Sequence, residues 1–253
     1  MSSLEITHVN SQHHRSKKIM MYIQNPQTSH LKTVVFFNPL PHEINRTQWY
    51  YKQISNKFAK FGVKSIRFDY PGTGNSCGDF QDFSLDDWIN ESTSIVTRLI
   101  DEHSHRVPIF LIGTRIGGSI ISLLPHKQGE NITNIFVDPI EDGNQFILDM
   151  KSLQEKFGYG QEFQAPFFPK NPVKQVFGYP WTETFTESLK SIKAETCRFH
   201  EGHVLLSKSR VSELTHSSLE DDFNWDDPKL LGHLAFSNHL VRRIKAIIDG
   251  GED

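Results

Sequence analysis

Short apolar runs, separated by turn-forming residues, predict a series of strands along the chain. The run at 33–37 has no polar alternation, which is typical of a strand buried on both faces. Two opening strands are predicted on either side of a polar turn. The predicted strands are 4–9, 18–22, 33–37, 63–68, 109–112, 132–137 and a later one near 203–206.

Amphipathic helices are predicted between these strands. The apolar positions of the first helix recur at helical spacing: Tyr51, Ile54, Phe58 and Phe61. Gly62 is expected to stop that helix, and Ser84 is expected to cap the next one, with Asp87 three residues further on. A helix after the strand at 109–112 runs to about Leu124, and a last helix spans about 234–248. Strands that alternate with helices in this way predict a mainly parallel sheet with helices on both faces.

The segment from Glu141 to about Glu195 interrupts this alternation. It holds prolines and many aromatic residues, namely Phe146, Phe157, Tyr159, Phe163, Phe167, Phe168, Phe177, Tyr179 and Trp181. One interpretation is a satellite helical layer that packs on the sheet, and the other is a lid that forms the apolar wall of a substrate pocket. The two are compatible, and we expect one domain over residues 1–253 with a lid insertion at about 141–195.

The residues around Arg115 carry the clearest chemical signal. A buried strand leads into Gly113-Thr114-Arg115-Ile116-Gly117 and then into a helix. This Gly-x-x-x-Gly frame is that of the nucleophile elbow of α/β-hydrolases, where small residues let a strand turn directly into a helix. We therefore predict an α/β-hydrolase fold with Arg115 at the position that ordinarily holds Ser, Cys or Asp. Arginine stays protonated and offers only hydrogen-bond donors, so it cannot serve as a nucleophile.

Neighbouring hydroxyl groups are not expected to replace the nucleophile. Ser119 lies one helical turn beyond Arg115, Ser76 belongs to a glycine-rich loop, and Thr114 is expected to point its side chain away from the site. None of them occupies the strained position of the elbow, so packing or capping roles are expected. The sequence therefore disfavours a Ser-His-Asp mechanism.

The other two members of a triad have only weak candidates. The strand after the lid leads into 207–210, which contains no carboxylate. Asp138, at the end of the strand at 132–137, is an alternative acid, or else it caps the next turn. His233, just before the last helix, is the candidate histidine, and a helix cap or an exposed surface position is the alternative.

Arg115 itself requires a compensating anion. A cation at the N-terminus of a helix is disfavoured by the helix dipole. One anion is internal: a buried, bidentate pair with Glu43, oriented by Asn45. The other is a substrate carboxylate or phosphate, or an oxyanion. We expect the internal pair, and the two can coexist because a guanidinium has five donors. Glu43 would then also be a candidate general base.

Four segments together resemble the exosortase A system-associated hydrolases, α/β-hydrolase-like proteins found beside bacterial exopolysaccharide genes. Two of them are loops: 37–46, which contains Glu-x-Asn, and 69–80, which contains Gly-x-Gly-Asn-Ser. The other two are the elbow at 113–117, with the pattern Gly-x-Arg-x-Gly, and the strand end at 137–146. Gly178-Tyr179-Pro180 also recurs as in that family. The resemblance covers roughly 33–195 and is poor beyond it. It implies the fold and a small-molecule or glycan-precursor setting, without implying a reaction.

Composition sets the remaining bounds. The net charge of -3 gives no reason to expect nucleic acid as a partner. The two cysteines, Cys77 and Cys197, are far apart in sequence, which suits a reducing cytoplasm rather than a disulfide framework or a zinc site. No run approaches the ~18 apolar residues of a membrane span. We expect a cytoplasmic protein with no cofactor and no metal ion.

Two functions remain open at this stage. In the first, the protein acts on or binds an acyl, ester-type or anionic biosynthetic intermediate, with Arg115, Glu43 and His233 as the chemical groups. In the second, it is a non-catalytic relative that binds a ligand or a protein partner in an exopolysaccharide or secondary-metabolite pathway. The residues expected to contact a substrate are His42, Asn45, Leu40, Thr114, Ile116, Asp138 and Trp181.

Overall fold

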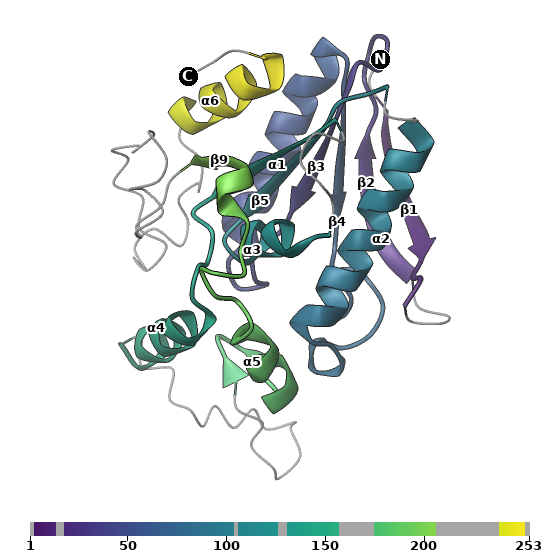
Figure 1. The fold of residues 1–253 in the computed structure, drawn as a ribbon. Helices are drawn as coiled ribbons and strands as arrows, with labels where there is room; N and C mark the ends of the chain where they lie inside the picture. Colours follow the sequence, from purple (N-terminus) through teal and green to yellow (C-terminus); the bar gives the residue numbers. More distant parts are fainter. Residues whose placement is uncertain are drawn as a thin grey trace.

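Seven strands form one sheet in the order β1-β2-β4-β3-β5-β6-β9 (Figure 1). β1 and β2 pair antiparallel with each other, β2 pairs antiparallel with β4, and the remaining neighbours are parallel. The strands are β1 (Leu4–Asn10), β2 (Lys18–Gln24), β3 (Lys32–Phe37), β4 (Val63–Phe68), β5 (Ile109–Thr114), β6 (Ile132–Val137) and β9 (Gly202–Leu205). This computed structural model describes residues 3–13, 18–103, 106–125, 131–156, 175–205 and 238–250. The sequence-based prediction of a mainly parallel sheet is confirmed.

Six α-helices and a small hairpin complete the described part of the chain. The helices are α1 (Ile44–Phe58), α2 (Leu85–His103), α3 (Ile116–Leu123), α4 (Gly143–Lys156), α5 (Glu183–Leu189) and α6 (Asn238–Asp249). The hairpin pairs β7 (Gln175–Val176) with β8 (Tyr179–Pro180). Short 3-10 helices span Ala59–Phe61, Phe80–Asp82 and Phe199–Glu201.

The sheet is covered on both faces, and β3 shows how. Its side chains alternate between two apolar clusters, as the two-residue period of a strand requires. Val34 and Phe36 join a cluster with residues of α1 and α6, whereas Val35 and Phe37 join a cluster with residues of α2 and α3. All four are fully buried, which explains why this run carries no polar alternation.

Local stop and start signals of the sequence are confirmed at two helices. Gly62 ends the first helical stretch with φ of 79°, a left-handed conformation that glycine adopts without steric cost. At the start of α2, the Ser84 amide donates to the Asp87 carboxylate at 2.8 Å, and the Asp87 amide donates to Ser84 Oγ at 3.2 Å. This reciprocal capping box fixes where α2 begins.

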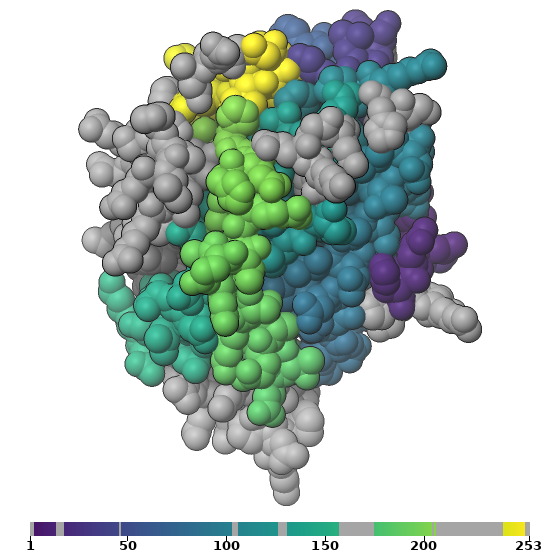
Figure 2. All heavy atoms as spheres, in the orientation of Figure 1, coloured from purple at the N-terminus to yellow at the C-terminus, as the bar shows by residue number. Residues whose placement is uncertain are grey.

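The segment that interrupts the alternation folds as α4, the β7–β8 hairpin and α5, beyond one end of the sheet (Figure 1). In the space-filling view, the green segment with α5 lies against teal α4 on one side and blue α2 on the other (Figure 2). The predicted lid aromatics Phe157, Tyr159, Phe163, Phe167 and Phe168 lie outside the described residues, as does the predicted helix start at 234–237.

Two glycines make the tight connection between β5 and α3 possible. A Cβ atom on Gly113 would lie 2.5 Å from the backbone of Gly117. A Cβ atom on Gly117 would lie 2.4 Å from the carbonyl oxygen of Phe37, at the end of β3. The helix therefore begins in direct backbone contact with two strands, and only glycine permits that approach.

We expect Gly117→Ala to destabilise the protein by about 1–3 kcal/mol, because the new methyl group meets backbone atoms that cannot rotate away. Gly118→Ala is the matched control, since it adds the same methyl group to the same helix, where the nearest atom is Pro139 Cβ at 3.1 Å. Urea unfolding of both variants measures the difference. Equal losses for the two variants would contradict the close-approach argument.

Candidate functional site

A single residue connects β5 to α3. Arg115 has φ of 53° and ψ of -121°, outside the regions that non-glycine residues ordinarily adopt. Its amide donates to the carbonyl oxygen of Val137 at 3.0 Å, and its own carbonyl accepts from the Gly118 amide at 2.9 Å. These bonds hold the residue in a strained turn at the carboxyl end of β5, and such strain is concentrated at functional sites.

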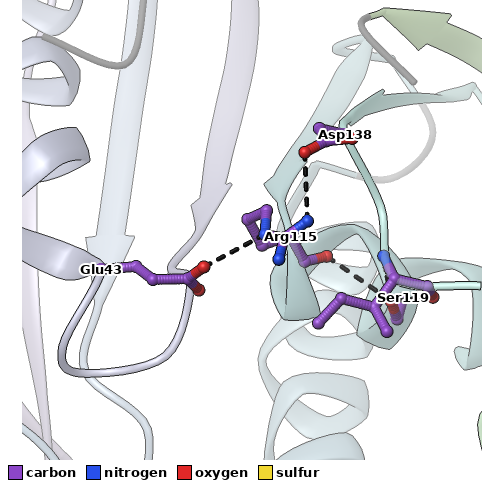
Figure 3. A network of polar contacts seen from close by, with 5 residues as sticks. Glu43, Arg115, Ser119 and Asp138 are labelled. Carbon is purple, nitrogen blue, oxygen red and sulfur yellow. Dashed lines mark hydrogen bonds and ion pairs between the residues drawn. The ribbon is translucent and has the colours of Figure 1, made fainter. Parts of the chain in front are cut away.

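The guanidinium of Arg115 is shared between two carboxylates (Figure 3). Nε donates to Glu43 Oε1 at 3.1 Å, and Nη1 donates to Asp138 Oδ2 at 3.1 Å. The Arg115 side chain is 14% exposed, and those of Glu43 and Asp138 are 7% and 9% exposed. These three residues, called the Arg115 cluster below, place one positive and two negative charges in a nearly buried position.

Three neighbouring strands bring the cluster together. β3, β5 and β6 are parallel neighbours, so their carboxyl ends meet at the same edge of the sheet. Glu43 caps the start of α1 after the loop that leaves β3, Arg115 follows β5, and Asp138 follows β6 with φ of 45°. In open α/β sheets this edge is where ligands bind.

The predicted Arg115–Glu43 pair is confirmed, and its predicted bidentate geometry is wrong. Glu43 Oε2 is buried and has no hydrogen-bond partner within the described residues, so only Oε1 meets the guanidinium. The second arm of the guanidinium goes to Asp138 instead, which makes Asp138 a partner of Arg115 rather than a simple turn cap. Asn45 is exposed on the first turn of α1, and within the described part of the chain no hydrogen bond joins it to the cluster.

An aromatic side chain of α4 lies over the guanidinium. The Arg115 Cζ atom lies 5.6 Å from the ring centroid of Phe146, at the start of α4. Phe146 in turn lies 6.2 Å from the ring of Trp181, which is 5% exposed. The sequence predicts Phe146 as one of the lid aromatics but does not predict its contact with Arg115. The one signal for this contact in the sequence is the position of Phe146 shortly after Asp138.

Other predicted substrate contacts are placed less directly. Leu40 and Ile116 have fully buried side chains on either side of the edge. His42 is partly buried and stacks on Phe177, with ring centroids 5.0 Å apart. Thr114 points away from Arg115, as predicted: its hydroxyl lies 2.5 Å from that of Tyr51, under α1. His233 lies outside the described residues.

The nearby hydroxyl groups have structural partners, as the sequence predicted. Ser119 Oγ donates to the carbonyl of Ile140 at 2.6 Å and accepts from its amide at 3.0 Å. Ser76 Oγ donates to the carbonyl of Asp69 at 2.6 Å and accepts from the Met20 amide at 2.9 Å. Both hydroxyl groups are therefore engaged in hydrogen bonds to the backbone of other parts of the chain.

Three further observations concern thiol chemistry, metal binding and membrane insertion in the described ranges. Burial raises the pKa of the Cys197 thiol, which keeps it protonated. Among the residues with described positions, no three His, Cys, Asp or Glu side chains are grouped so as to hold a metal ion. None of the helices in those ranges is both long and apolar enough to cross a membrane.

We expect Arg115→Met to destabilise the protein by about 3–5 kcal/mol, because it leaves two carboxylates buried without their cation. Glu43→Gln should cost less, since Asp138 still neutralises Arg115. The Arg115→Met/Glu43→Gln double variant should lose clearly less than the sum of the two single losses. Denaturant unfolding of the four proteins gives the coupling.

The exposed pair of Lys190 and Glu187 provides the control. Its side chains are 42% and 60% exposed, so the corresponding Met and Gln variants should be nearly additive. Additive losses at Arg115 and Glu43 as well would mean that the buried contact has no energetic role.

The comparisons with known proteins agree with this architecture. The profile of the family Hydrolase_4, described as serine aminopeptidase, S33, matches residues 29–176 of the 253. Among proteins with curated descriptions, none matches the sequence.

Two solved structures resemble the fold. One is a putative hydrolase from Agrobacterium vitis S4, with a TM-score of 0.52 and 17% identity, over 76% of this chain and 73% of that one. The other is Est1E from Butyrivibrio proteoclasticus with bound ferulic acid, with a TM-score of 0.52 and 18% identity, over 75% and 72% of the two chains. Identities this low show the fold alone. The family profile matches more than half of this chain. The chain therefore belongs to the Hydrolase_4 family, described as serine aminopeptidase, S33, and has the α/β-hydrolase fold.

Proposed function

We propose that this α/β-hydrolase-like protein carries Arg115 in place of the nucleophilic serine and holds a small molecule above the Arg115 cluster, without forming an acyl-enzyme. Two observations on Arg115, one of its backbone and one of its side chain, support this proposal. The backbone keeps the strained turn between β5 and α3, and the side chain is bound to two nearly buried carboxylates. A guanidinium offers donors and no nucleophilic lone pair, so the elbow retains its shape while its covalent chemistry is lost.

The net charge of the Arg115 cluster argues against the anionic ligand that the sequence suggested. One guanidinium and two carboxylates leave one net negative charge, which weakens the case for an anionic ligand. Glu43 Oε2 is a buried acceptor with no hydrogen-bond partner in the described part of the chain. Leaving such an atom unsatisfied costs about 1–3 kcal/mol, and a donor from a ligand would remove that cost. The ligand class is therefore a molecule whose polar head, a hydroxyl or an ammonium group, donates a hydrogen bond.

The rest of the ligand is proposed to be apolar and acyl-like. Phe146 lies against the guanidinium and contacts Trp181, so the segment at 141–195 brings aromatic surface to the cluster. This supports its role as a lid. From the resemblance to exosortase-associated hydrolases, we propose that the ligand is a cytoplasmic intermediate of a bacterial exopolysaccharide or secondary-metabolite pathway. A partner protein of such a pathway is the alternative occupant, and His233 stays a predicted member of the site.

A fluorophosphonate probe should leave the protein unlabelled, because the hydroxyls of Ser119 and Ser76 are held in buried hydrogen bonds. Intact-protein mass spectrometry measures the labelling, with an active serine esterase as the positive control. Stoichiometric labelling at either serine would contradict the proposal. Turnover of p-nitrophenyl esters that disappears in Glu43→Gln would instead support a catalytic function with Glu43 as a general base, which its unpartnered Oε2 favours.

Ligand selectivity should follow hydrogen-bond donation. Octylamine and octan-1-ol carry a donor, whereas octanoate and methyl octanoate do not. We expect the first two to bind at least about tenfold more tightly, as a buried acceptor without a donor costs on the order of 1–3 kcal/mol. Calorimetry and thermal shifts measure this series, since a ligand that binds the folded state raises the Tm.

Glu43→Gln should invert this preference. In the variant, the amide oxygen must face the Arg115 Nε donor, so the NH2 group takes the place of Oε2. A donor then stands where an acceptor stood, and the acceptor ligands octanoate and methyl octanoate should bind better than the amine. Tight wild-type binding of octanoate would overturn the donor class while leaving ligand binding intact. Failure of all four compounds to bind would overturn the acyl-binding proposal itself.

A further inference from the structure

A pocket lies under α1, at the side of the sheet formed by β1, β2 and β4. It has a volume of about 250 Å³ and is lined by Leu4, Gln24, Lys52, Ser55, Asn56 and Arg67. Arg67 comes from β4, and β3 separates that strand from β5, which leads into Arg115. The pocket is therefore distinct from the Arg115 cluster, and all its lining residues are described.

Neither cation of this pocket is in direct contact with a carboxylate of the described residues. In the ranges that the structure describes, neither Arg67 nor Lys52 forms a direct ion pair. The Arg67 Cζ atom lies 5.2 Å from the ring centroid of Tyr22, and the Asp69 carboxylate acts on Arg67 only from a longer distance. Arg67 is only partly exposed, and burial lowers the pKa of its guanidinium, although Tyr22 and Asp69 act in the opposite direction. A partly buried guanidinium without a direct ion pair is incompletely compensated, and an anion bound beside it would offset that cost.

The other lining residues fit an anion rather than a second cation. None of the six carries a negative charge. Asn56 is exposed at the pocket and supplies an amide donor, while Ser55 Oγ is already used as a donor to the carbonyl of Tyr51 at 2.6 Å. Leu4, half exposed, adds an apolar border. In a chain with a net charge of -3, such a concentration of positive charge is a local departure from the overall balance.

We propose that the pocket formed by Arg67, Lys52 and Asn56 binds a small phosphate monoester. Its two positive charges match the charge of about -1.5 to -2 that a phosphate monoester carries at neutral pH, whereas a monocarboxylate would balance only one. Arginine presents a planar fork of donors to phosphate oxygens, and lysine adds a point charge. The volume of about 250 Å³ lies just below the range of pockets for drug-sized ligands, so a phosphate with a short organic group fits it.

The test is calorimetric titration of the full chain with glycerol 3-phosphate, inorganic phosphate and acetate at matched ionic strength. The two phosphates should bind and acetate should not. Arg67→Gln should weaken phosphate binding about tenfold or more, and Lys52→Gln should weaken it less. Lys57→Gln is the matched control, because Lys57 is an exposed lysine of the same helix and does not line the pocket.

Folding is checked in the same samples by thermal unfolding. Arg67→Gln removes a cation that forms no direct ion pair, so its Tm without phosphate should change little, and its loss of binding then reports on the site rather than on unfolding. Equal weakening by Lys57→Gln would mean general charge screening and would overturn the proposal. Absence of phosphate binding, or acetate binding as strong as that of phosphate, would overturn it as well.

Discussion

The carboxyl edge of the sheet depends on the two ion pairs of the Arg115 guanidinium. The guanidinium joins Glu43, at the start of α1, to Asp138, at the end of β6, through two bonds of 3.1 Å. All three side chains are nearly buried, so each charge relies on the others for the stabilisation that water would otherwise provide. Three strand ends that are distant in sequence are thereby held in one arrangement.

The backbone around Arg115 explains how a long cationic side chain fits at this position. Gly113 and Gly117 allow β5 and α3 to meet within the turn, and the Arg115 amide is bound to the carbonyl of Val137. The resulting conformation, with φ of 53°, costs energy and persists because its surroundings hold it in place. A turn of this kind projects its side chain toward the ligand-binding edge of an α/β sheet, whatever that side chain is.

The two sites have opposite charge balance, and this separates the ligands they favour. The Arg115 cluster combines one cation with two carboxylates and leaves Glu43 Oε2 without a hydrogen-bond partner among the described residues. The pocket under α1 presents Arg67 and Lys52 with no carboxylate in its lining. The ligands that we propose, a donor-bearing acyl compound for the first site and a phosphate for the second, would each supply the charge or hydrogen bond that the protein does not.

The sequence by itself determined the features that depend on neighbouring residues. The apolar run of β3, the stop at Gly62 and the cap at Ser84 follow from periodicity and from local backbone preferences, as does the turn at Arg115. Only the tertiary structure decided which groups meet: Asp138 takes the second arm of the guanidinium, and Phe146 covers it. These contacts join separate strand ends and helix starts, and the distance between such elements is set by how the whole sheet and its helices pack, which no spacing along the chain records.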